Sequence, residues 1–108
     1  MSDSQTSIIV FGTMDCDVAN LHRFKSEAER VVTATRSEPG CLAYHIVLED
    51  EARGRFLTVE RWADAQALAE HMKTPHVAAF TKVCGPHIRA ADVSVFDAAA
   101  SRSLMSDT

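Results

Sequence analysis

The sequence predicts a single antiparallel α+β domain whose elements follow the order β-α-β-β-α-β, and three observations lead to this. The chain has 108 residues, the usual length of one domain. Apolar residues recur at helical spacing in two separate stretches, and segments with strand character flank each stretch. Right-handed crossover connections then give one four-stranded antiparallel sheet with both helices on one face, a ferredoxin-like topology.

The first half of the chain contains a strand, a long helix and a second strand. The β-branched run Ile8–Phe11 is typical of a buried strand. Asp17 is a suitable N-cap, and apolar residues recur at helical spacing over Leu21–Thr35. The Glu-Pro-Gly segment 38–40 predicts a tight turn, because glycine accepts a positive φ. Alternation over Cys41–Glu49 predicts the second strand, with one face formed by Leu42, Tyr44, Ile46 and Leu48, and the other by Ala43, His45 and Val47.

The second half contains a hairpin strand, an interrupted helix and a last strand. The polar turn 50–54 leads into a strand over Arg55–Trp62. A helix over Ala65–Lys73 follows, and Thr74 with Pro75 restarts it, since threonine suits the N-cap and proline the first helical position. Glycine and proline at 85 and 86 end this helix, and His87–Phe96 is the last strand.

The two ends of the chain are polar, and we expect a disordered N-terminus over residues 1–6 and a flexible tail over 98–108. The domain itself is predicted to span residues 7–97. The net charge of −4 disfavours a nucleic-acid partner, which would need a basic face. Because no apolar run approaches the ~20 residues that span a bilayer, we expect no membrane partner and a soluble, cytoplasmic protein.

One face of the predicted sheet has no helix to cover it, although the strands carry apolar residues on both sides. In a stable protein, an apolar face of this kind packs against another surface. A second copy of the chain, related by a two-fold axis, is the simplest cover. The sequence therefore predicts a homodimer.

The segment from Glu38 to Phe80 resembles the antibiotic biosynthesis monooxygenase-like domain. The shared features are the Glu-Pro-Gly-Cys turn, the tyrosine three residues after it, and the Glu-x-Trp-x-Asp end of the third strand. A leucine-containing turn that leads to His71 and the Pro-His pair ending at His76 complete the match. The resemblance implies that two ferredoxin-like chains pair into a dimeric α+β barrel.

The family resemblance implies a cofactor-independent monooxygenase that oxidises a small electron-rich aromatic (a phenol, anthrone or quinol) with O2. An isomerase needs nearly the same residues, because it also begins by removing a proton, and a non-catalytic dimeric module that binds a small hydrophobic molecule is a third possibility. The haem-degrading branch places an asparagine on its first strand, and residues 8–13 contain none. With four glycines and no glycine-rich loop, the chain is not expected to bind a dinucleotide, and no cofactor is predicted.

His76 is the first candidate for the general base. It lies in the first turn of the restarted helix, where the partial positive charge disfavours an imidazolium cation. A neutral ring there accepts a proton from a substrate hydroxyl, or it merely caps the helix break and bonds to backbone.

His71 and Glu60 are the other two candidate catalytic residues. His71 lies at the edge of the second helix's apolar stripe, where a buried, hydrogen-bonded histidine is the plainer interpretation. Glu60 shares a strand face with aromatic residues, and an unpaired carboxylate there would be costly. A histidine or arginine partner would make Glu60 structural, whereas an open cavity would make it an acid or a base.

The remaining candidates are expected to contact a substrate rather than react with it. Trp62 could stack on an aromatic ligand or simply pack, and Tyr44 is either a cavity wall or a core residue. His45 faces the dimer interior or a pocket, and Phe80 continues the apolar face of the last helix. No metal site is predicted, because a proline separates His71 from His76 and interrupts helical ligand spacing.

Overall fold

The structure, a computed structural model, describes residues 7–105. The predicted disorder of residues 1–6 and the last three residues of the predicted tail lie outside this range. Between these limits the chain forms four long strands, three α-helices and two 3-10 turns, in the order β1 (Ser7–Cys16), η2 (Val18–Asn20), α1 (Leu21–Thr35), β2 (Cys41–Asp50), β3 (Arg55–Trp62), α2 (Ala65–His71), α3 (Pro75–Cys84), η3 (Gly85–His87) and β4 (Ile88–Ala98).

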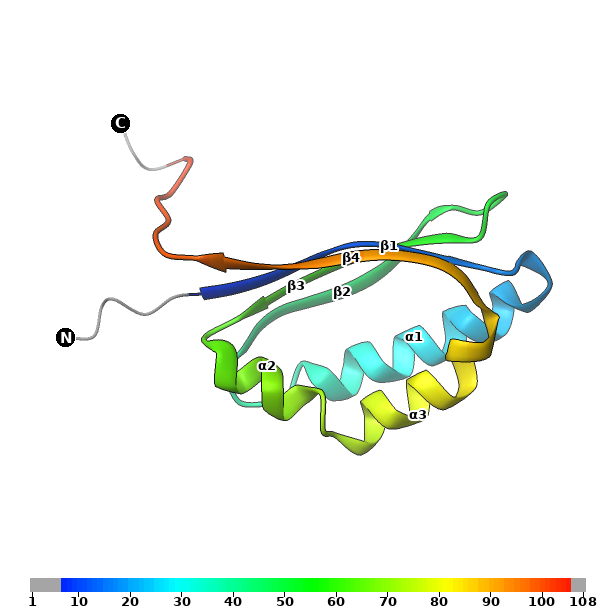
Figure 1. The fold of residues 1–108 in the computed structure, drawn as a ribbon, viewed down its shortest axis with the longest axis horizontal. Helices are drawn as coiled ribbons and strands as arrows, with labels where there is room; N and C mark the ends of the chain where they lie inside the picture. Colours follow the sequence, from blue (N-terminus) through cyan, green and yellow to red (C-terminus); the bar gives the residue numbers. More distant parts are fainter. Residues whose placement is uncertain (1–6, 106–108) are drawn as a thin grey trace.

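The four strands form one sheet in the order β2-β3-β1-β4, and every neighbouring pair is antiparallel. The helices all lie on the same side of this sheet, so the molecule has two layers (Figure 1). We call the side of the sheet that faces the helices the inner face, and the opposite side the outer face. The predicted ferredoxin-like α+β fold is therefore confirmed.

The first strand is much longer than the sequence pattern indicated. β1 extends to Cys16 instead of ending at Phe11, because β3 and β4 pair with it on both sides as far as residue 15. Gly12 lies in the middle of β1, and a Cβ there would come within 2.1 Å of the Asp92 carbonyl oxygen. Glycine at this position thus allows the β4 backbone to come close as the strand bends.

The predicted face of Leu42 is wrong. A register shift between Cys41 and Ala43 inserts one residue into β2, so Cys41 pairs with Trp62 while Ala43 pairs with Arg61. Leu42 is consequently 51% exposed instead of sharing the inner face with Tyr44, which is buried. From Tyr44 onward the predicted alternation holds.

The core between the sheet and the helices consists of two clusters. One contains Trp62 and Tyr44 with the apolar residues Ile8, Val10 and Val31. The other is built around the stacked rings of Phe24 and Phe56, whose centroids lie 4.5 Å apart, and contains the buried thiols of Cys16 and Cys84. Phe80 packs against both clusters, so α3 joins the two halves of the core.

The outer face of the sheet is not covered by any helix, and it carries large exposed apolar side chains. Phe11, Val47 and Phe96 are each about half exposed on this face. β4 contains no buried residue along its whole length. No α-helix between residues 7 and 105 is long and apolar enough to cross a bilayer.

The break between α2 and α3 is held by a local network around Thr74. The Thr74 hydroxyl donates to the carbonyl oxygen of His71 at 2.8 Å, and its oxygen accepts from the Val77 N–H at 3.3 Å. Pro75 follows as the first residue of α3. The structure therefore confirms the predicted cap and restart, although α2 ends at His71, two residues earlier than expected.

Replacing Thr74 with alanine is expected to lower the free energy of unfolding by about 1 kcal/mol, because the variant loses the N-cap of α3. Thr74→Ser retains the hydroxyl and is expected to keep most of this stability. Urea denaturation of the two variants beside the native protein measures the difference. Equal losses in both variants would show that the methyl group, not the hydroxyl, stabilises this break.

Candidate active site

The loop between α1 and β2 places Glu38 beneath the α2–α3 break. The Glu38 N–H donates to the carbonyl oxygen of Thr35, and the Cys41 N–H donates to the carbonyl oxygen of Glu38, so the loop is a compact turn. Gly40 adopts a φ of 83°, which glycine tolerates without strain. Its carbonyl oxygen accepts from the Ala63 N–H at 2.8 Å, and this bond ties the turn to the end of β3.

Two histidines converge on one oxygen of Glu38. His71 Nδ1 lies 2.9 Å from Glu38 Oε2, and His76 Nε2 lies 2.5 Å from the same atom. The side chains of Glu38 and His71 are 11% and 3% exposed, whereas that of His76 is 24% exposed. His76 is therefore the member of this cluster that a molecule from solvent reaches most easily.

The contacts with Glu38 fix which nitrogen of each ring carries a proton when both rings are neutral. An ionised carboxylate only accepts hydrogen bonds, so His71 Nδ1 and His76 Nε2 must both be donors. The lone pairs then lie on His71 Nε2 and His76 Nδ1. A carboxylate that orients an imidazole in this way prepares the opposite nitrogen to accept a proton.

An aromatic cluster packs behind His71. The ring centroids of His71 and Trp62 are 4.6 Å apart, and those of His71 and Tyr44 are 5.2 Å apart. Trp62 and His71 are fully buried, and Tyr44 nearly so. Burial, together with the nearby carboxylate of Glu60, raises the pKa of the Tyr44 phenol. Tyr44 therefore stays neutral, and the cluster holds the His71 ring firmly in one orientation.

Glu60 is buried on the inner face, and its hydrogen bonds run to its own strand. Trp62 Nε1 donates to Oε1 at 2.9 Å, and the Thr58 hydroxyl donates to Oε2 at 3.3 Å. Desolvation by burial raises the pKa of this carboxyl, although the bond from Trp62 and the nearby His71 act in the opposite direction. The sequence predicts a histidine or an arginine as the partner of a structural Glu60. Its hydrogen-bond donors are instead the Trp62 indole and the Thr58 hydroxyl.

His45 lies away from the histidine cluster, whereas Phe80 packs against the core cluster that contains Trp62 and Tyr44. His45 is exposed on the outer face, where its Nδ1 lies 3.0 Å from Arg36 Nη2. Phe80 packs against Phe24 in the core, with ring centroids 5.5 Å apart. The structure brings together His71, His76, Trp62 and Tyr44, with Glu60 bonded to Trp62.

Glu38 is a candidate site residue that the sequence analysis did not single out. The Glu-Pro-Gly turn already explained why a glutamate stands at this position, so the sequence analysis assigned no function to its side chain.

The helix break at Thr74 and Pro75 does not separate His71 from His76, because both rings face the same carboxylate. The donor atoms of Glu38, His71 and His76 all lie within 4.8 Å of one another, so these three residues could hold a metal ion.

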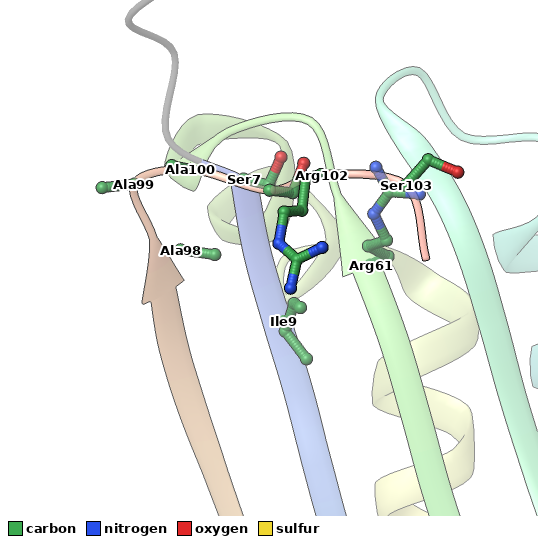
Figure 2. Close-up of a pocket in the computed structure, with 9 residues that line it drawn as sticks. Ser7, Ile9, Arg61, Ala98, Ala99, Ala100, Arg102 and Ser103 are labelled. Carbon is green, nitrogen blue, oxygen red and sulfur yellow. The ribbon is translucent and has the colours of Figure 1, made fainter. Parts of the chain in front are cut away.

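A cavity of about 290 Å³ opens beside Glu38 on the surface of the molecule. Its lining comes from the 38–40 turn and from the start of α2, and it includes the acidic residues Glu38, Asp64 and Glu70. A larger cavity of about 620 Å³ lies under the C-terminal segment, lined by Ser7, Ile9, Arg61 and residues 98–103 (Figure 2). The larger cavity contains no predicted site residue.

Comparison with known proteins gives a family for this fold and this cluster. The profile of the family described as antibiotic biosynthesis monooxygenase matches residues 7–83. The chain belongs to the antibiotic biosynthesis monooxygenase family. The match includes Glu38, Glu60 and both histidines, so it spans the whole candidate site, and the resemblance found in the sequence is confirmed.

Solved structures of other proteins share this fold. A protein of Caulobacter crescentus named for the family is 26% identical, with a TM-score of 0.80 over 88% of this chain and 92% of its own. A Pseudomonas aeruginosa protein has the same TM-score at 21% identity, over 92% of this chain and 100% of its own. An uncharacterized Synechocystis protein is 26% identical over 90% of this chain and 67% of its own length. The two solved structures share the fold of this chain, and none of the three relatives is named for a substrate.

Replacing Glu60 with glutamine is expected to raise the free energy of unfolding relative to the native protein, and this difference should grow as the pH rises. A raised pKa means that the folded state binds the proton more tightly than the unfolded state does. The stability that this proton provides is fully present at low pH and is lost as the pH rises through the raised pKa. Glu60→Gln keeps an acceptor for Trp62 and has no such loss.

The measurement is the free energy of unfolding of Glu60→Gln and of the native protein between about pH 4 and about pH 8. The advantage of the variant should grow with pH over this range. Glu29→Gln, which changes an exposed glutamate on α1, is the control for removing a carboxylate in general. A constant difference across the range would mean that Glu60 ionises as easily in the folded protein as in the unfolded chain.

Proposed function

We propose that the protein is a cofactor-independent monooxygenase that deprotonates a small electron-rich aromatic, such as a phenol, an anthrone or a quinol, and adds oxygen to its anion. The observation that supports this most directly is the convergence of His71 and His76 on Glu38. This arrangement orients an imidazole as a general base without any further group. Membership of the family supports the choice of oxygen chemistry.

His76 is the base in this proposal, and the other residues position it. Its side chain is the most exposed of the cluster, and its Nδ1 carries the lone pair when Nε2 donates to Glu38. His71 holds the same carboxylate oxygen from the buried side, so Glu38 cannot turn away. Trp62 and Tyr44 form an apolar wall behind His71, and that wall keeps water from reaching Glu38 from behind.

The proposed reaction requires no external reductant. For an anthrone, the base removes a proton from the CH2 group, and the carbanion transfers one electron to O2. The resulting radical pair combines into a C–O–O bond, which is protonated to a hydroperoxide. Loss of water from the hydroperoxide leaves a carbonyl, so one oxygen atom enters the product and the other leaves as water. All four electrons that reduce O2 come from the CH2 group of the substrate.

We also propose that the working form is a homodimer that buries the outer face of the sheet. Phe11, Val47 and Phe96 present apolar surface there, and soluble monomers rarely expose contiguous apolar patches of this kind. The helices lie on the inner face, whereas no helix covers the outer face, so the outer face is open to a second copy. Two-fold pairing of this face would close two sheets into the α+β barrel.

The thiols support a cytoplasmic location. Cys16, Cys41 and Cys84 are all free, and Cys16 and Cys84 are buried among apolar residues. Unpaired cysteines are usual in the reducing cytoplasm and unusual in secreted domains of this size. We therefore place the protein in the cytoplasm.

His76→Ala is expected to reduce turnover by at least ~100-fold, because it removes the base. The measurement is oxygen uptake by the purified protein with a panel of anthrones, quinols and catechols and no added cofactor. His22→Ala changes an exposed histidine on α1 and should leave turnover unchanged. Uptake that persists in His76→Ala would contradict the assigned base. If no substrate drives uptake, exchange of a substrate proton for deuterium would identify an isomerase, and binding without exchange a non-catalytic module.

Phe11→Lys is expected to dissociate the dimer, since it places a charge in the middle of the outer face, which the proposed dimer buries. The dimer dissociation constant should rise by at least about 30-fold, equivalent to an interface hot spot of about 2 kcal/mol. Val18→Lys is the matched control, because Val18 is 49% exposed, nearly the same as Phe11 at 48%, but lies in η2. Sedimentation equilibrium measures both. Dissociation of both variants, or of neither, would place the dimer interface elsewhere.

A further inference from the structure

The Glu38–His71–His76 cluster has the composition and the geometry of a metal site. Its three donor atoms come from three separate elements: the turn before β2, the end of α2 and the first turn of α3. All three atoms lie within 4.8 Å of one another. We propose that these residues bind one divalent transition-metal ion, of the class of Zn²⁺ or Co²⁺.

The donor set selects this class of metal. Two imidazoles and one carboxylate suit zinc, cobalt and related ions, whereas Ca²⁺ and Mg²⁺ prefer sites built from oxygen alone. Three protein ligands leave a fourth position open, which water or a substrate oxygen would fill. With the ion on Nε2, the His76 ring carries its proton on Nδ1 and cannot act as the base, so the metal-bound form is distinct from the cofactor-independent oxygenase proposed above.

The three donor atoms have to shift to the spacing of a bound site, and this includes the two nitrogens, which lie within 4.8 Å of each other. Two ligand atoms of a tetrahedral site with bonds of about 2.0–2.1 Å lie roughly 3.3–3.4 Å apart. The two nitrogens now lie 2.9 and 2.5 Å from Glu38 Oε2, so each has to move outward by less than about 1 Å. Binding requires each neutral ring to change tautomer, because the proton leaves the ligating nitrogen (His71 Nδ1 or His76 Nε2) and the opposite ring nitrogen carries it.

The surroundings favour an ion at this point. The His71 ring is packed between Trp62 and Tyr44, which fixes one ligand before the metal arrives. The cavity of about 290 Å³ reaches Glu38 but is lined by neither histidine, and Asp64 and Glu70 add negative charge to its lining. His76, at 24% exposed, lies on the more accessible side of the cluster and supplies the third protein ligand.

Titration of the full-length protein with Co²⁺, after removal of metals with a chelator, tests the site through the visible absorption of the bound ion. We expect one Co²⁺ per chain, with the intense bands of a four- or five-coordinate centre. His76→Ala should weaken the affinity by at least ~10-fold, because even residues that only support a ligand change affinity by 10- to 100-fold. Glu38→Gln, of nearly the same shape, should also weaken it.

His45→Ala is the control, since this exposed histidine lies on the outer face of the sheet. It should bind Co²⁺ with the affinity of the native protein. Cooperative urea unfolding of each variant shows that the fold is intact. Absence of stoichiometric binding, or equal affinities in the native protein, His76→Ala and Glu38→Gln, would overturn the proposal. The titration contains no substrate, so its result is independent of the oxygen-uptake experiment.

Discussion

The carboxylate of Glu38 is the contact on which the arrangement of the helical layer at this end of the molecule depends. One of its oxygens meets His71 at the end of α2 and His76 at the start of α3. The same residue closes the turn from α1 into β2 through its backbone, so one position joins three helices and an edge strand. A carboxylate that is largely removed from water needs hydrogen bonds, and two imidazoles supply them to Oε2 of Glu38. The contact is therefore structural and chemical at once.

Behind this contact lies a second carboxylate whose partners differ in kind. Glu60 accepts hydrogen bonds from an indole and a hydroxyl, whereas both contacts of Glu38 are with imidazole rings. Neutral donors offset less of the cost of burying an ionised group than a cation would, and the raised pKa reflects this difference. Glu38 and Glu60 thus have separate parts: the first orients the histidines, and the second fixes Trp62, against which His71 packs.

Local patterns predicted the elements of this fold, and non-local pairing decided where they end. The helical periodicity of α1 and the Thr74–Pro75 restart follow from neighbouring residues alone. The length of β1 depends on strands far away in the sequence, and the bulge at Leu42 leaves no sign in the alternation of β2. At the site, the histidines and Trp62 were found because their types are unusual on apolar faces. Glu38 was missed because the Glu-Pro-Gly turn already explained why a glutamate stands there. Its side-chain contacts with α2 and α3 form only in the tertiary structure.

The helix break beside the site is a condition for its chemistry. In an uninterrupted α-helix, residues five positions apart are separated by about 140° around the axis, so one carboxylate could not reach both rings. The Thr74 hydroxyl satisfies the carbonyl of His71 as α2 ends, and Pro75 starts α3 in a new direction. That change of direction brings His76 back over Glu38 and leaves its ring more exposed than that of His71. Capping residues that look purely structural in the sequence therefore set both the distance between the two imidazoles and which of them meets solvent.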